Sequence, residues 1–201
     1  MIRIAHRINT VEQLRQVPHE YGIELDLRDS RGKLVLWHDP FPPEDAPAFE
    51  DFLPAYRHRL MILNVKSERI EWAVLDLIKR YNIERYFFLD SSFPMIRQLV
   101  QKGESRIAVR FSEFEPIESA LALAGQVEWV WIDCFTKMPL TPDTYRQLKR
   151  HFKLCAVSPE LQGRAVESIA DYAAQLADYP MDAVCTKRPD LWPEAQSNFG
   201  Q

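Results

Sequence analysis

Residues 61–90, MILNVKSERIEWAVLDLIKRYNIERYFFLD, place two short apolar runs on either side of a longer amphipathic segment. Residues 61–66 and 86–90 are rich in aliphatic and aromatic side chains, which is typical of buried strands. Residues 70–81 between them have the apolar spacing of a helix. A strand, a helix and another strand in this order predict two parallel strands joined by a crossover helix.

The same alternation extends over the whole chain. The expected strands are residues 3–6, 23–28, 61–66, 86–90, 107–111, 130–134, 154–158 and 183–187. The expected helices are residues 11–17, 48–58, 70–81, 94–102, 116–124, 142–151 and 164–177, and Pro54 should end or kink the second of them. Eight strand-helix units close into a barrel, so we predict a compact α/β fold, the (β/α)8 TIM barrel. An open doubly wound sheet is the alternative, but its phosphate-binding glycine fingerprint is missing.

Residues 33–38 do not fit the eightfold alternation. They follow a turn sequence, Asp29-Ser30-Arg31-Gly32, and the connection to the strand before it is too short for a parallel crossover. We therefore predict a small β-hairpin after the second strand. Its end would bring His38 close to Glu24 and Asp26.

Composition sets limits on the class of protein. The chain has 201 residues, of which 46% are hydrophobic and 27% charged, which fits one globular domain over residues 1–201. A formal net charge of −4 provides no basic field for phosphates, so we expect no nucleic-acid partner. No apolar run is long enough to cross a bilayer, so we expect no stable membrane insertion and a cytoplasmic location.

The three cysteines, Cys134, Cys155 and Cys185, lack metal-ligand spacing and lie within or at the end of expected strands. We expect buried free thiols.

Two carboxylates of the second expected strand provide the first chemical signal. Glu24 and Asp26 are alternate residues, so both side chains point into the barrel interior. Side by side in a dry site they repel each other unless a proton or a cation neutralises them. A hard divalent ion with oxygen ligands, Mg²⁺ or Ca²⁺, is the cofactor that this pair predicts. Ion pairs with Arg28, Arg110 or Lys66 are the structural alternative.

Two histidines stand beside these carboxylates. His6 and His38 each end an apolar run, and histidine titrates near neutral pH, so one ring can accept a proton while the other donates one. The alternative is that each ring holds a loop through backbone hydrogen bonds. The remaining histidines, His19, His58 and His151, are expected at the surface.

These residues resemble the signature of the glycerophosphodiester phosphodiesterase family. The resemblance lies in His6-Arg7, Asn9-Thr10, Glu24-Leu25-Asp26 and His38-Asp39, and more weakly in the segment from Asp182 to Asp190. It implies the same barrel and a small phosphodiester substrate. It further implies phosphate binding by Arg7 and Lys66, and attack on phosphorus by a neighbouring hydroxyl of the substrate to give a cyclic phosphate, which water then opens.

The chain departs from the family at two of these positions. Ile8 replaces the usual glycine, and Asn64 replaces an acid that completes the family's metal site. An amide oxygen can bind Mg²⁺ or Ca²⁺ but carries no charge, so we keep Asn64 as the third metal ligand and expect weaker binding. The alternative is an inactive barrel that binds a phosphorylated ligand.

Two carboxylates near the ends of later strands are candidates for binding substrate hydroxyls. They are Asp133 and Glu160, and each could equally cap a helix or hold a loop.

Overall fold

The computed structural model describes residues 1–193 and confirms the predicted (β/α)8 barrel with its hairpin. Residues 194–201, which the predicted 1–201 domain includes, lie outside the described residues. The parallel strands are β1 (Ile2–Ala5), β2 (Gly22–Ser30), β4 (Met61–Val65), β5 (Tyr86–Leu89), β6 (Ala108–Phe111), β7 (Trp129–Ile132), β8 (Lys153–Val157) and β9 (Ala183–Thr186).

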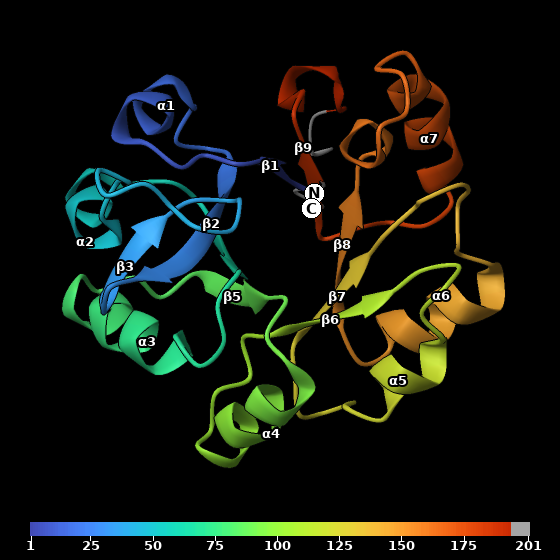
Figure 1. Ribbon diagram of the computed structural model, residues 1–201. Helices are drawn as coiled ribbons and strands as arrows, with labels where there is room; N and C mark the ends of the chain where they lie inside the picture. The colour runs from blue at the N-terminus through green and yellow to red at the C-terminus, as the bar shows by residue number, and fades with distance from the viewer. Residues whose placement is uncertain (194–201) are drawn as a thin grey trace, which may run out of the picture.

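The strands form a ring with the helices outside it (Figure 1). Neighbouring strands pair in the order β5-β4-β2-β1-β9-β8-β7-β6. The first and last strands of this order meet through one isolated parallel bridge, between Phe88 and Ile107. The barrel is therefore joined most weakly along the seam between β5 and β6.

Helices follow the strands as the sequence predicts. They are α1 (Val11–Gln16), α2 (Phe49–Phe52), α3 (Glu71–Arg80), α4 (Phe93–Gln101), α5 (Ile117–Leu121), α6 (Pro142–Lys149) and α7 (Ser168–Leu176). Thr10 and Thr141 begin α1 and α6 with side-chain caps. The second helix stops early, because Pro54 lies in a 3₁₀ turn, η1 (Leu53–Ala55), that follows α2.

The hairpin strand β3 (Lys33–Leu36) pairs antiparallel with the extended end of β2. Leu27 lies opposite Leu36, and the backbone N–H of Trp37 donates to the carbonyl of Asp26 at 3.0 Å. This pairing carries the chain back over the mouth of the barrel and places His38 beside it.

The core has two layers, because alternate strand residues face opposite sides of the sheet. The larger layer lies between the strands and the helices. The smaller one fills the barrel interior and includes Phe87 and Trp129, whose rings stack at 4.6 Å between centroids. Polar side chains occupy the carboxyl ends of the same strands, so the interior is apolar at one end and polar at the other.

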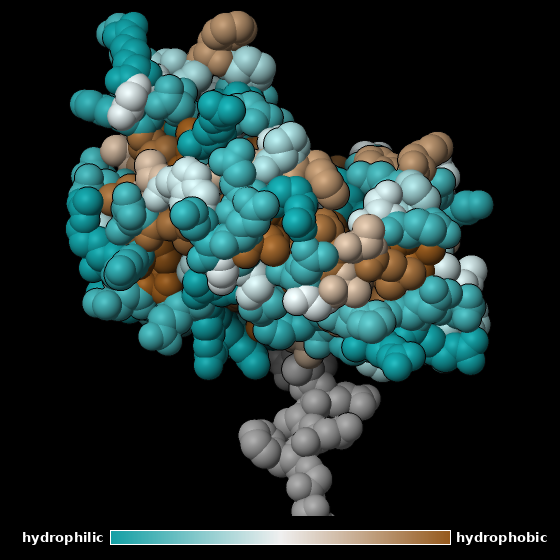
Figure 2. Space-filling model, turned by 90° about the horizontal axis from the view of Figure 1, so that it is seen from below, coloured by the Kyte–Doolittle hydropathy of each residue, from teal (hydrophilic) through white to brown (hydrophobic). Residues whose placement is uncertain are grey.

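The three cysteines are free and buried, as predicted. The expectation for His58 is wrong, because this ring is buried and its Nε2 lies 2.9 Å from the carbonyl oxygen of Val17. No helix in residues 1–193 is long and apolar enough to span a membrane. Seen from the α4 side, the surface is mostly hydrophilic, with hydrophobic patches between the polar side chains (Figure 2).

Candidate active site

The candidate site lies at the carboxyl ends of the strands. There β2 presents Glu24, Asp26 and Arg28 as successive alternate residues, and the neighbouring β4 runs in register with it, pairing Asn64 with Asp26. His6 directly follows β1 on the other side of β2. Strand pairing alone therefore brings these residues to one place.

Glu24 and Asp26 are almost completely buried, with exposed fractions of 0% and 1%. The backbone N–H of Arg7 donates to Glu24 Oε2 at 2.7 Å. Burial raises the pKa of Glu24 to about 7, and repulsion by Asp26 adds to this rise. The pair thus carries a charge that its surroundings only partly neutralise.

Asn64 bridges the two carboxylates with its amide nitrogen. Nδ2 donates to Glu24 Oε1 at 2.8 Å and lies 3.4 Å from Asp26 Oδ1. The other amide atom, Oδ1, is buried without a hydrogen-bond partner in the structure. The assignment of oxygen and nitrogen in an amide follows from its hydrogen bonds. A cation between the carboxylates would favour the reversed amide, with Oδ1 facing the pair.

The loop after β1 fixes Asp26 from the other side. Asn9 Nδ2 donates to Asp26 Oδ2 at 2.9 Å, and the backbone N–H of Asp26 donates to Asn9 Oδ1, also at 2.9 Å. Arg7, in the same loop, has a φ of 58°, an uncommon conformation for a residue other than glycine. This backbone turns its N–H toward Glu24, while its Nε lies 3.8 Å from Asp26 Oδ2.

His6 lies against the acidic pair. Its Nε2 is 3.7 Å from Glu24 Oε2, and its Nδ1 is buried without a hydrogen-bond partner. Burial, together with the positive charges of Arg7, Lys187, His38 and Lys66, lowers the pKa of His6 to about 3. The ring is therefore neutral near neutral pH.

His38 is more open to solvent, with 39% of its side chain exposed. Its Nδ1 lies 2.7 Å from Asp39 Oδ1. Arg28 holds the loop that carries His38. Its Nε and Nη2 donate to the carbonyl of His38 at 3.1 and 2.8 Å, and its Nη1 donates to the carbonyl of Lys66 at 2.7 Å. One guanidinium thus ties together the two loops that carry His38 and Lys66.

A chain of charges continues across the mouth. Lys66 Nζ lies 3.2 Å from Asp90 Oδ2 and 4.0 Å from Asp26 Oδ1. Arg110 donates from Nε and Nη2 to Asp90 Oδ1 at 2.8 and 2.6 Å, and from Nη1 to Asp133 Oδ2. Burial raises the pKa of Asp133 to about 6, although Arg110 opposes the rise.

Glu160 is buried and bonded on both oxygens. Thr186 Oγ1 and the backbone N–H of Lys187 donate to Oε1 at 2.6 and 2.9 Å, and Ser158 Oγ donates to Oε2. These contacts tie the loop after β8 to the end of β9. Binding of substrate by Glu160 or by Asp133 stays a prediction.

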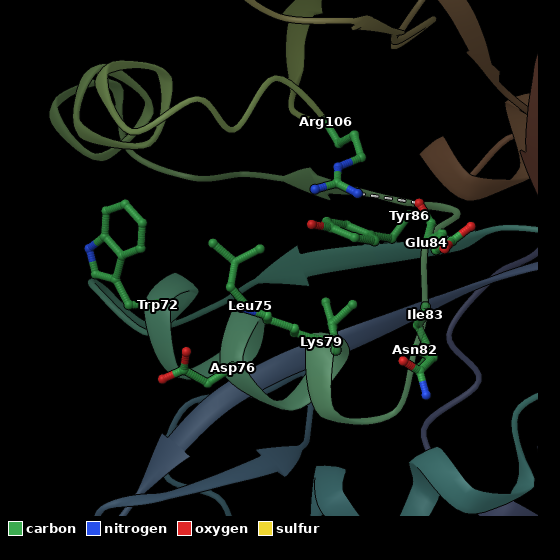
Figure 3. A pocket seen from close by; sticks show the side chains of 10 residues that line it. Trp72, Leu75, Asp76, Lys79, Asn82, Ile83, Glu84, Tyr86 and Arg106 are labelled. Atoms are coloured by element: carbon green, nitrogen blue, oxygen red, sulfur yellow. Dashed lines mark hydrogen bonds between the residues drawn. The ribbon is translucent and has the colours of Figure 1, made fainter.

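A pocket of about 280 Å³ opens beside the acidic pair, between the loops that follow β1 and β3. Its lining includes Arg7, Asn9, Trp37 and His38. A second pocket, of about 450 Å³, lies on the outside of the barrel beside α3 and the seam (Figure 3). There the guanidinium of Arg106 lies over the ring of Tyr86, 4.2 Å from its centroid. Tyr86 is at the amino end of β5, so this pocket lies away from the acidic pair.

In the part of the chain that the structure describes, no three His, Cys, Asp or Glu residues are arranged to hold a metal ion. The structure brings together His6, Arg7, Glu24, Asp26, Asn64 and Lys66, and it places His38 at the edge of the same pocket as Arg7.

The structure places four further residues among these groups, namely Asn9, Arg28, Asp90 and Arg110. Sequence analysis named Arg28 and Arg110 only as alternative ion-pair partners and Asn9 only as part of the family motif, and it gave Asp90 no role. Each stands at or just beyond the end of a strand, or alternates with the acidic pair along β2. That position is the signal that would have identified them.

No protein-family model matches this chain, and no curated protein matches it. Solved structures do. A glycerophosphodiester phosphodiesterase from Agrobacterium tumefaciens has a TM-score of 0.69 and 16% identity, covering 96% of this chain and 99% of that one. A glycerophosphoryl diester phosphodiesterase from Parabacteroides distasonis has a TM-score of 0.67 and 15% identity, with 98% and 88% covered.

A mutant tryptophan synthase α-subunit from Pyrococcus furiosus is also similar, with a TM-score of 0.59 and 13% identity over 94% of this chain and 88% of that one. At such identities the comparison establishes the barrel fold, which hosts many unrelated reactions. The family whose motifs this sequence resembles is thus found among its structural neighbours, and the function is argued from the site.

Proposed function

We propose that this protein is a metal-dependent phosphodiesterase that cleaves a glycerophosphodiester or a related small phosphodiester. The observation that carries the proposal is the buried pair Glu24 and Asp26 with His6, Arg7 and Lys66 around it. A negative pair beneath positive groups suits a cation and an anionic ester together. The similarity in fold to glycerophosphodiester phosphodiesterases supports the same reaction.

Glu24, Asp26 and Asn64 would hold the metal, Mg²⁺ or Ca²⁺. Their side chains fit a hard cation, because they offer buried oxygens and Asn64 Oδ1 has no hydrogen-bond partner in the structure. When bound, the ion would polarise the phosphoryl oxygens and lower the pKa of the attacking hydroxyl. Arg7 and Lys66 would bind the remaining phosphate oxygens.

The two histidines would move the protons. A hydroxyl of the substrate attacks phosphorus and gives its proton to His6, which burial keeps neutral. The bond from phosphorus to the leaving oxygen breaks, and His38, paired with Asp39, donates the proton that completes the alcohol. The product is a cyclic phosphate, and water opens it when the two rings exchange roles.

Hydrolysis of glycerophosphodiesters, which carry a hydroxyl next to the phosphate, tests the proposal. We expect activity that a chelator abolishes and that Mg²⁺ or Ca²⁺ restores. His6→Ala and His38→Ala should each lower kcat by about 10²- to 10⁴-fold, whereas His151→Ala, at an exposed position, should not. Activity that ignores the chelator and both substitutions would overturn the assignment.

A second candidate is a barrel that binds a phosphorylated ligand without turnover. The amide of Asn64 favours it, because Nδ2 already donates to both carboxylates and so reduces the need for a cation. Calorimetry with glycerol phosphate distinguishes the two. Binding that needs no metal, with no hydrolysis of any phosphodiester, would establish this candidate instead.

A further inference from the structure

The exposed large hydrophobic side chains are unevenly distributed over the barrel. Within residues 1–193, each of them lies between the end of a strand and the first turn of the helix that follows. Phe41 is 96% exposed and Phe114 is 72% exposed. The full set, here called the rim, consists of Phe41, Trp72, Phe93, Phe114, Phe135, Val166 and Leu191.

The strands of a barrel all end on the same face, so these connections lie at the end of the barrel that holds the acidic pair. Trp72 also lines the second pocket, on the outside of the barrel (Figure 3). The connections at the opposite end contribute no residue to this set within the described chain. Single exposed hydrophobic residues are common on soluble proteins. Their restriction to one face, with one on each connection from β3 to β9, calls for a partner on that face.

Two rim positions show how the side chains are displayed. Phe41 stands between Pro40 and Pro42 with a φ of 60°, which is an outlier for a bulky residue, and its ring is almost fully exposed. Phe114 and Phe135, from different loops, place their ring centroids 5.9 Å apart. Aromatic rings held outward in this way retain apolar surface that a partner can bury.

We propose that the rim inserts into a phospholipid surface, from which the site takes a lipid phosphodiester that carries a free hydroxyl next to its phosphate, as a lysophospholipid does. This inference rests on the proposed function, because the headgroup linkage of a phospholipid is itself a phosphodiester. A flat surface across the barrel mouth contacts all seven connections together, whereas a small soluble substrate contacts few of them. Apolar side chains that reach into the interface between headgroups and acyl chains are the usual means of such binding.

The arrangement favours a lipid over a protein partner. Protein interfaces have a contiguous apolar core, whereas the rim residues come from seven separate connections around the barrel. Charges among the same loops are paired with each other, as in Arg188 with Asp190 at 2.7 Å and Lys66 with Asp90 at 3.2 Å. We therefore expect binding to zwitterionic vesicles that depends little on salt.

Cosedimentation with phosphatidylcholine vesicles tests the inference directly. Phe41→Ser and Phe114→Ser should each weaken partitioning by about tenfold, because each ring loses its apolar burial. The double variant that carries both substitutions should bind more weakly still. Its matched control carries a third substitution, Gln101→Phe, at the exposed end of α4. This returns a phenylalanine to the end of the barrel opposite the rim and should not restore binding. His6→Ala should bind vesicles as the wild type does.

Activity separates this inference from the proposed function. The double rim variant should hydrolyse a soluble glycerophosphodiester at the wild-type rate and lose activity on lysophosphatidylcholine held in the vesicles. The inference would be overturned if the protein did not bind vesicles, or if the rim substitutions left binding unchanged. Binding confined to anionic vesicles and abolished by salt would also overturn it. So would a dimer that the rim substitutions dissociate. Vesicle binding without hydrolysis of any phosphodiester would instead overturn the proposed function.

Discussion

Asn64 lies between two buried carboxylates and offers them an amide in place of a third charge. Its nitrogen donates to both Glu24 and Asp26, which suits a protein without metal, and its unpaired oxygen suits a protein with one. A single side chain therefore influences whether the metal-free or the metal-bound protein is favoured, and a single substitution can change that preference.

Asn64→Asp should strengthen Mg²⁺ binding by about tenfold or more, because a third carboxylate adds charge to the ligand set. In the metal-free protein the same change should lower the Tm, since a third buried carboxylate repels the other two. Calorimetry with Mg²⁺ and melting curves with and without it measure both effects. Unchanged affinity together with an unchanged Tm would show that no cation site exists here.

Arg28 acts at the same scale by holding two loops. Its three donated hydrogen bonds reach the carbonyls of His38 and Lys66, so it is a positioning residue rather than a catalytic one. Arg28→Ala should lower kcat by about ten- to a hundredfold, because small displacements of catalytic groups are costly. Added guanidinium ion should restore part of this activity. A parallel loss of kcat and Tm without such rescue would reduce Arg28 to a stabilising role.

At the scale of elements, the seam between β5 and β6 is where the barrel depends most on side chains. One backbone bridge joins the two strands. Glu104 braces them: it accepts hydrogen bonds at 2.8 Å from Tyr86 on β5 and from the Nε, Nη2 and backbone N–H of Arg106, just before β6. The ring of Tyr86 in turn lies under the Arg106 guanidinium.

Glu104→Gln should lower the free energy of unfolding by about 1–3 kcal/mol, because it removes a charged acceptor from a buried network. Although burial of Glu104 favours its neutral form, its hydrogen bonds to Arg106 lower its pKa overall. Its contribution is therefore present above the ordinary glutamate pKa and lost as the pH falls through the lowered one. Urea denaturation at pH 7 and in acid measures this, with the exposed Glu12→Gln as control. Equal stability of Glu104→Gln and wild type would show that backbone pairing suffices at the seam.

At the scale of the whole molecule, the polar mouth opposes folding when no cation is bound. The pKa of Glu24 rises from 4.5 to about 7 and that of Asp133 from 3.8 to about 6, in both cases mainly through burial. Between these values the folded protein binds more protons than the unfolded chain. Stability from these two groups is therefore complete at low pH and lost as the pH rises through their raised pKa values.

The Tm of the metal-free protein should accordingly fall between pH 5 and pH 7, and Glu24→Gln should fall less. Mg²⁺ should raise the Tm of the wild type more at pH 7 than at pH 5, because a proton competes with the ion at the lower pH. Scanning calorimetry at both values provides the measurement. An equal Mg²⁺ effect at the two pH values would place the ion elsewhere or exclude it.

The sequence by itself determined the order of elements, the barrel and the hairpin. These depend on local periodicity: alternate residues of a strand share a face, and apolar residues three and four apart share one side of a helix. Glu24 and Asp26 could be placed in the interior by that rule alone, and so could Asn64 on β4 and Lys66 directly after it. Pro54 could be expected to end its helix because its ring blocks the backbone pattern.

Only the tertiary structure decided what these side chains contact. Asn64 lies 40 residues from Glu24 in sequence, and Lys66 lies 24 from Asp90. Such contacts follow from strand register and from the backbone of loops, as in the left-handed conformation of Arg7, and neither leaves a periodic trace in the sequence. Three further features arise in the same way, because distant segments meet only when the barrel forms. They are the burial of His58, the hydrogen bonds from Arg28 to two loops, and the position of the rim on one face.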